Sequence, residues 1–265
     1  CSMTSLFNLG LAAYFGARVC AGVRLMSGGR FFDWAANGLI AAGWVVQTVY
    51  ICLRWAEAGR APFSNMFESL VLFGWTVAAV FLVLRLRTNI PWLAAASAAL
   101  SATVLAHAST FESAIRPLVP ALQSNWLTFH VLTCFLGYGG FAVSALVAAG
   151  YLIVDRRGGG VQTETGETLE TVLTRTNSFG FLFLTLGILT GAVWANSAWG
   201  TYWSWDPKET WSLITWFIYA IFLHCRFVRG WRGRRAAWIS IIGFVSVLFT
   251  YYGVNFLLAG LHSYG

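Results

Sequence analysis

The sequence contains little charge, because Asp, Glu, Lys and Arg make up only 10% of its 265 residues. A soluble domain carries about 25% charged residues, so the composition excludes an ordinary soluble globular protein. Hydrophobic residues account for 58% of the chain, and the mean hydropathy is +0.67. Strand-like alternation in segments of about ten residues is also lacking, which argues against a transmembrane β-barrel. The composition therefore predicts a helical integral membrane protein.

Paired cysteines are missing as well. The chain has five scattered cysteines with no CxxC spacing: Cys1, Cys20, Cys52, Cys134 and Cys225. This spacing predicts neither a zinc site nor a redox dithiol. We expect the cysteines to act as small apolar side chains within helices.

Long apolar runs are abundant. Eight of them reach about 18 residues or more, the length that crosses roughly 30 Å of hydrocarbon. They cover residues 5–23, 33–53, 67–84, 91–108, 126–154, 178–197, 211–228 and 237–258. The sequence predicts an all-α polytopic membrane protein with about eight transmembrane helices, forming a single helical membrane domain over residues 1–265.

The basic residues gather in alternate loops. Twelve follow the first, third, fifth and seventh runs: Arg24, Arg30, Arg85, Arg87, Arg156, Arg157, Arg175, Arg226, Arg229, Arg232, Arg234 and Arg235. The other loops hold four, namely Arg54, Arg60, Arg116 and Lys208. The positive-inside rule places the larger set in the cytoplasm. Both termini and the 199–211 segment are therefore predicted to lie outside, and the net charge of +7 does not indicate a nucleic-acid partner.

The longest segment predicted to lie inside is 155–177. Its Gly158–Gly160 run predicts a flexible link. Apolar residues at Leu169, Val172 and Leu173 then predict a short surface helix.

Two helix starts are indicated by capping residues. Ser64 is the predicted cap of the third span, although the acid of a capping box comes one residue late, at Glu68. Before the seventh span, Asp206 suits a cap, Pro207 the first helical position and Glu209 the first turn.

The segment WGTYWSWDPKETW at 199–211 holds four tryptophans beside two acids and a lysine. Tryptophan and tyrosine favour membrane interfaces. This preference explains isolated aromatic residues, but it does not explain indoles that are followed directly by acids.

The chain has four histidines. His107, His130 and His262 lie at the predicted outer level, whereas His224 lies thirteen residues into the seventh run. A single histidine can be a hydrogen-bonded packing residue, but ionisable groups in a membrane are also candidates for function. Two imidazoles from different helices can bind one haem iron axially, and tryptophan faces suit a porphyrin ring.

The stretch WGTYWSWDPKETWSLITWFIYAIFLHCR resembles the WWD signature of haem-handling proteins. It is most similar to the CcsA (ResC) family of system II cytochrome c assembly. Four further blocks resemble the same family in the same order: PFSNMFESLVLFGW at 62–75, PALQSNWLTFHV at 120–131, TLGILTGAVWANSAWG at 185–200 and LLAGLHSYG at 257–265.

The resemblance implies a role for each matched residue. His130 and His262 correspond to the external, catalytic pair that binds the iron of haem b. The residues that hold the haem ring are Trp199, Trp203, Trp205, Asp206 and Trp211. His224 corresponds to an intramembrane histidine that helps haem to pass, and His107 matches no motif.

The implied activity is that of a holocytochrome c synthase, or haem lyase, which attaches haem to the CxxCH motif of apocytochrome c. The second intramembrane histidine of the complete synthase is absent, which implies a ResB/CcsB-type membrane partner. A thiol-reducing thioredoxin-like protein is a further implied partner. The resemblance places the protein in a bacterial plasma membrane or a thylakoid membrane, with its active site on the outer, periplasmic or lumenal side.

Three alternatives remain open from the residues. A haem exporter without attachment chemistry would need a continuous polar path from His224 to the outer site. A CcmC- or CcmF-type WWD protein would pass haem to a chaperone. A structural membrane scaffold would use the aromatics only as belt residues.

Overall fold

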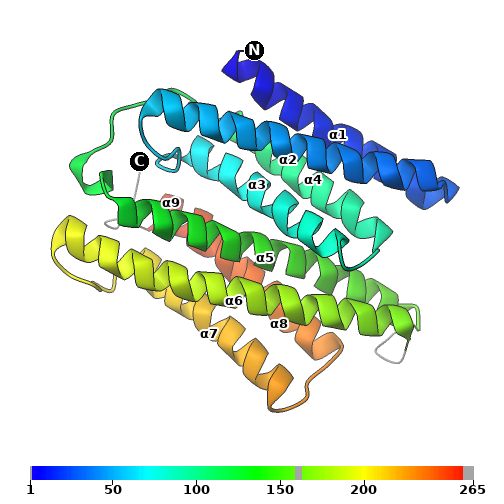
Figure 1. The fold of residues 1–265 in the computed structure, drawn as a ribbon. Coiled ribbons are helices and arrows are strands. Elements are labelled where there is room, and N and C mark those ends of the chain that lie inside the picture. Colours follow the sequence, from blue (N-terminus) through cyan, green and yellow to red (C-terminus); the bar gives the residue numbers. More distant parts are fainter. Residues whose placement is uncertain (1, 159–162, 259–265) are drawn as a thin grey trace. The chain divides into compact units, whose positions relative to one another are not determined.

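The computed structural model describes residues 2–158 and 163–258, which are mostly helical and contain no strand (Figure 1). The chain divides into two compact units, Cys1–Pro117 and Leu118–Gly265. Seven helical stretches among the described residues are long and apolar enough to cross a membrane. Helix α7, at 21 residues, is an eighth of comparable length. The predicted all-α polytopic membrane fold with about eight spans is confirmed, whereas the outward orientation of the termini stays a prediction.

The first unit consists of four helices. These are α1 (Met3–Ser27), α2 (Arg30–Ala58), α3 (Met66–Arg85) and α4 (Pro91–Ala108). A buried polar bridge links three of them, because Gln47 of α2 accepts a hydrogen bond from Tyr14 of α1 at 2.7 Å and donates to the carbonyl of Val71 of α3 at 2.6 Å. Both ends of the Gln47 amide are satisfied, which makes its burial tolerable in an apolar interior.

Helix α3 begins one residue later than predicted. Asn65, not Ser64, is the cap, and its side chain accepts from the N–H of Glu68 at 2.8 Å. The Glu68 carboxylate accepts from the N–H of Ser64 at 2.9 Å and forms ion pairs with Arg54 at 2.9 Å and Arg60 at 3.2 Å. The side chain of Glu68 is fully buried. Glu68 therefore both completes the helix start and pairs with two cations.

The second unit contains the remaining elements. They are η1 (Pro120–Leu122), α5 (Asn125–Arg156), α6 (Glu164–Trp199), α7 (Pro207–Phe227), α8 (Arg234–Leu248), the π-helical turn η2 (Phe249–Gly253) and α9 (Val254–Leu257). Helices α5 and α6 lie side by side (Figure 1). They approach so closely at Gly137 that a Cβ atom there would lie 3.0 Å from the carbonyl oxygen of Gly180.

The predicted short surface helix is not short, because it forms the first part of α6. Helix α6 runs without a break for 36 residues, a length of about 54 Å. Its start is capped by Thr163, whose side chain accepts from the N–H of Gly166 at 3.1 Å. Leu169, Val172 and Leu173 are buried on one face of this helix, so the helical periodicity was correct. Of the predicted Gly link, 159–160 lie outside the described residues.

Candidate functional site

One end of the second unit brings together the beginning of α5, the end of α6, the 200–206 loop, the beginning of α7 and α9 (Figure 1). This is the end that the positive-inside rule predicts to lie outside. Most of the predicted site residues belong to these segments.

His130 lies in the second turn of α5, and its ring is hydrogen-bonded to the backbone of α6. The Nδ1 atom is 2.7 Å from the carbonyl oxygen of Gly187. A carbonyl oxygen only accepts, so Nδ1 carries a proton, and in the neutral imidazole the lone pair is on Nε2. Metal-binding histidines commonly donate their other ring N–H to a backbone carbonyl in this way. This tautomer of His130 is one that can bind a metal, because a neutral imidazole ligates through the nitrogen that carries no proton.

Two glycines of α6 make room for this arrangement. A Cβ atom on Gly191 would lie 2.6 Å from His130 Nδ1, and one on Gly187 would lie 2.5 Å from the sulfur of Cys134. Any side chain at these positions would push α5 away from α6 or move the imidazole. Sequence reasoning did not single out these glycines, although their G-x-x-x-G spacing is typical of close helix packing in membranes.

Trp194 extends the site from His130 toward the end of α6. Its ring is nearly parallel to the imidazole, with centroids 6.0 Å apart at 14°. Its side chain is almost fully buried, and its Nε1 donates to the carbonyl of Ala121 at 2.9 Å. The ring of Trp199 meets Trp194 with centroids 4.8 Å apart at 69°. His130, Trp194 and Trp199 therefore form one continuous aromatic series, of which Trp194 was not predicted as a site residue.

The beginning of α7 fixes the shape of the 200–206 loop. Asp206 caps the helix, accepting from the N–H of Lys208 at 3.1 Å, and Glu209 completes a capping box. The Glu209 carboxylate accepts from the N–H of Asp206 at 3.2 Å and from that of Ser204 at 2.8 Å. The predicted helix start, with Pro207 in the first turn, is confirmed. The carboxylates of Asp206 and Glu209 are therefore hydrogen-bonded to backbone N–H groups of the loop and of the helix start.

Two indoles stand at the loop itself. Trp203 and Trp205 pack edge to face, with centroids 5.7 Å apart at 89°. Trp205 has a φ of 60°, an uncommon left-handed conformation for a bulky residue, and 68% of its surface is exposed. A strained backbone conformation persists where the surrounding contacts hold it in place. Here the hydrogen bonds of Glu209 supply that support and leave the Trp205 indole at the surface.

Two other residues of α7 connect it to the last helical segments. Lys208 donates to the side-chain oxygen of Asn255 in α9 at 3.0 Å. The ring of Trp211 packs against Phe249 in η2, with centroids 4.2 Å apart. Both contacts hold the loop against the end of the chain that leads toward residue 262, the second predicted iron ligand. His262 itself lies outside the described residues.

The remaining histidines are elsewhere. His224 is exposed in the last turn of α7, about 26 Å along the helix from Pro207. It therefore lies toward the opposite end of the second unit from the tryptophan loop, and the structure does not bring it to His130. His107 lies in the last turn of α4, in the first unit, where its ring contacts Phe111.

The fold and the site together define a class: a helical integral membrane protein with a histidine–tryptophan site beside a capped, tryptophan-rich loop. Residues 63–262 match the family model described as Cytochrome C assembly protein. The chain is 40% identical over 260 residues to the cytochrome c biogenesis protein CcsA of Parasynechococcus marenigrum (strain WH8102), covering 86% of this chain and 85% of that protein. It is 38% identical over 289 residues to the CcsA protein of Gloeobacter violaceus (strain ATCC 29082 / PCC 7421), covering 86% of each. The chain belongs to the cytochrome c assembly protein family, as a CcsA-type cytochrome c biogenesis protein.

A solved structure with a similar fold is that of the cytochrome c heme lyase CcmF, with a TM-score of 0.74. The match covers 94% of this chain and 46% of the CcmF chain, at 20% identity. At this identity the likeness is one of fold. It places the helices of this chain in an arrangement that a heme lyase also uses.

Proposed function

We propose that the chain is the haem-handling subunit of a cytochrome c synthase, which holds haem b and presents it to apocytochrome c. The observation that carries this proposal is the setting of His130. Its Nδ1 is fixed on the Gly187 carbonyl and its ring lies against Trp194, which leaves Nε2 with the lone pair. The names of the CcsA relatives and of the heme lyase with a similar fold agree with such a role.

The residues of the site suit a haem substrate in two respects. The ring is a broad apolar disc, and the indoles of Trp199, Trp203 and Trp205 offer flat apolar surfaces for it. The iron takes axial ligands, for which we propose His130 and His262. Ligand type and solvent access then set the redox state of the bound iron.

We assign supporting roles to the other predicted site residues. Asp206 shapes the loop through its cap, and Trp211 holds the loop against Phe249. His224, in the last turn of α7, would help haem to pass from the inner side.

The attachment chemistry needs no oxidant. Each thiol of CxxCH adds its S–H across one haem vinyl group, so one C–S bond and one C–H bond form as the C=C bond becomes single. The histidine of CxxCH takes an axial position and displaces one ligand of this chain. The contribution of the chain is mainly positioning, which converts an encounter between two reactants into an oriented reaction.

We also propose the setting in which this occurs. The site faces the outer, periplasmic or lumenal side of a bacterial plasma membrane or a thylakoid membrane. A ResB/CcsB-type partner completes the synthase, and a thioredoxin-like protein keeps the CxxCH thiols reduced. The two units would then act as one membrane domain.

The test is holocytochrome formation in cells that express the chain with its ResB/CcsB-type partner and an apocytochrome c. His130→Ala should abolish covalent haem attachment. The matched control is His107→Ala, which removes another histidine predicted at the outer level and should keep attachment near the wild-type yield. Full attachment by His130→Ala would overturn the proposal.

A further inference from the structure

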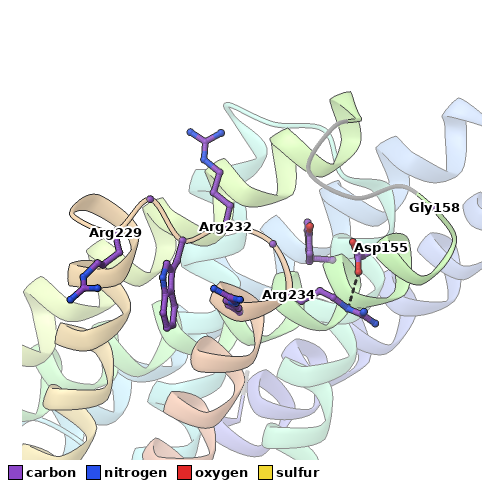
Figure 2. A pocket seen from close by; sticks show the side chains of 10 residues that line it. Asp155, Gly158, Arg229, Arg232 and Arg234 are labelled. Carbon is purple, nitrogen blue, oxygen red and sulfur yellow. Dashed lines mark ion pairs between the residues drawn. The ribbon is translucent and has the colours of Figure 1, made fainter.

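A basic pocket lies at the end of the second unit away from the tryptophan loop, between the end of α5 and the loop that joins α7 to α8 (Figure 2). Its volume is about 780 Å³, which is within the range of ligand pockets, roughly 300–1,000 Å³. Its charged and aromatic lining consists of Tyr151, Asp155, Arg229, Trp231, Arg232, Arg234 and Arg235. The lining thus contains four cations and one acid.

The single acid neutralises only part of this charge. Asp155 pairs with Arg234 at 3.0 Å, and Arg235 lies over the ring of Trp231 at 5.4 Å. Arg229 and Arg232 form no ion pair with any residue that the structure describes. Figure 2 shows both of them projecting from the loop, while Arg234 faces Asp155. Two guanidinium groups are therefore available to an anion.

Another acid that contacts this loop already has partners. Glu170 of α6, buried beneath the loop, pairs with Arg226 at 2.5 Å and accepts from the N–H of Gly233. It stabilises the loop but does not offset the charge of Arg229 or Arg232.

The backbone adds to the attraction for anions. Helix α8, of 15 residues, begins in the pocket lining directly after Gly233 and has no side-chain cap. The first N–H groups of a helix and its macrodipole favour a negative charge at this end. The uncapped helix start and the two uncommitted arginines border the same cavity.

Apolar side chains beside the pocket distinguish an amphiphile from a small free anion. Phe227 and Val228, which directly precede Arg229, are 69% and 68% exposed, and Trp238 in α8 is 51% exposed. A free phosphate gains nothing from such surfaces, whereas acyl chains do. No histidine, cysteine or methionine is among the described residues that line the pocket, and Tyr151 is the one side chain there of a type that ligates haem iron.

We propose that this pocket binds the phosphate head group of an anionic phospholipid, with its acyl chains along Phe227, Val228 and Trp238. Arginine matches phosphate oxygens with two parallel hydrogen bonds. Basic pockets between membrane helices on the cytoplasmic side are suited to such head groups. The bound lipid fixes the corner between α7 and α8, at the end where His224 lies, and its binding does not depend on haem attachment.

The test uses the purified full chain in detergent and measures binding of phosphatidylglycerol and phosphatidylcholine by native mass spectrometry. The variant Arg229→Gln/Arg232→Gln should weaken phosphatidylglycerol binding about ten- to thirtyfold, because each arginine near an anionic head group contributes several-fold. The single variant Arg232→Gln should weaken phosphatidylglycerol binding by roughly the square root of the factor seen for the double variant. Phosphatidylcholine should bind weakly throughout.

The matched control is Arg30→Gln/Arg87→Gln, which removes two exposed arginines of the first unit with the same change in net charge. It should bind phosphatidylglycerol like the wild type. Equal weakening in the control, or unchanged binding in Arg229→Gln/Arg232→Gln, would overturn the proposal. Displacement of the lipid by an equal concentration of inorganic phosphate or of haem would overturn it in favour of that ligand.

Discussion

The Nδ1 atom of His130 lies 2.7 Å from the carbonyl oxygen of Gly187, so the imidazole is held by the backbone of the neighbouring helix. The same stretch of α6 continues into Trp194 and Trp199. A change that moves α6 against α5 must therefore move the proposed iron ligand and the aromatic surface together.

Gly191→Ala should impair haem retention while the helices still form. The added Cβ would lie 2.6 Å from His130 Nδ1, so the ring must leave its place and lose its bond to Gly187. Overpacking of this kind costs about 1–3 kcal/mol. The measurement is the haem content and melting temperature of the purified complex.

The matched control for this variant is Gly38→Ala in α2, where an added Cβ meets nothing within 4 Å. Alanine favours a helix over glycine, so this control should be neutral or slightly stabilising. Equal haem content in Gly191→Ala and Gly38→Ala would show that the position of His130 does not depend on the α5–α6 contact.

Glu209→Ala should loosen the tryptophan loop. The substitution removes the acceptor of the N–H groups of Ser204 and Asp206, at a cost of about 0.5–2 kcal/mol for a lost cap. Trp205 then loses the support for its left-handed backbone. Faster protease cleavage within 200–206 and weaker haem retention are the expected results. Glu209→Gln, which keeps an acceptor oxygen, should be milder, and identical cleavage rates for all three proteins would contradict this interpretation.

Glu68→Ala should strongly destabilise the first unit. Its carboxylate is fully buried between Arg54 and Arg60, and removal of one partner from a buried ion pair costs about 3–5 kcal/mol. The free energy of unfolding in detergent measures this effect. The exposed acid Glu112, paired with Arg116 at the surface, provides the comparison: Glu112→Ala should change stability by about 0–1 kcal/mol. Similar losses for both variants would contradict the proposed role of Glu68.

Local signals predicted much of the fold. The apolar runs located the membrane helices, because crossing the hydrocarbon core requires a minimum length. Asp206, Pro207 and Glu209 predicted the start of α7, because a capping box depends only on neighbouring residues. The cap of α3 was misplaced by one residue, although the acid was informative: Glu68 falls at the third helical position only if Asn65 is the cap.

The site was predicted only in part, because its geometry depends on contacts between helices. His130 and the tryptophans were predicted from the resemblance, but Gly187, Gly191 and Trp194 were not. Their role arises where α5 and α6 approach, and nothing local to α6 indicates which residue of α5 will lie against it. The sequence did not reveal that α6 is continuous for another reason. The polar residues that precede its apolar run resemble a loop, although they form the first turns of the same helix. The roles of His224 and His262 in haem handling stay predictions.

The absorbance spectrum of the purified complex tests the proposed iron site most directly. The wild type and His107→Ala should show the spectrum of haem with two histidine ligands. His130→Ala should lose or alter that spectrum, and added imidazole should restore it by occupying the position of the missing Nε2. An unchanged bis-histidine spectrum in His130→Ala without imidazole would contradict the assignment of His130 as an iron ligand.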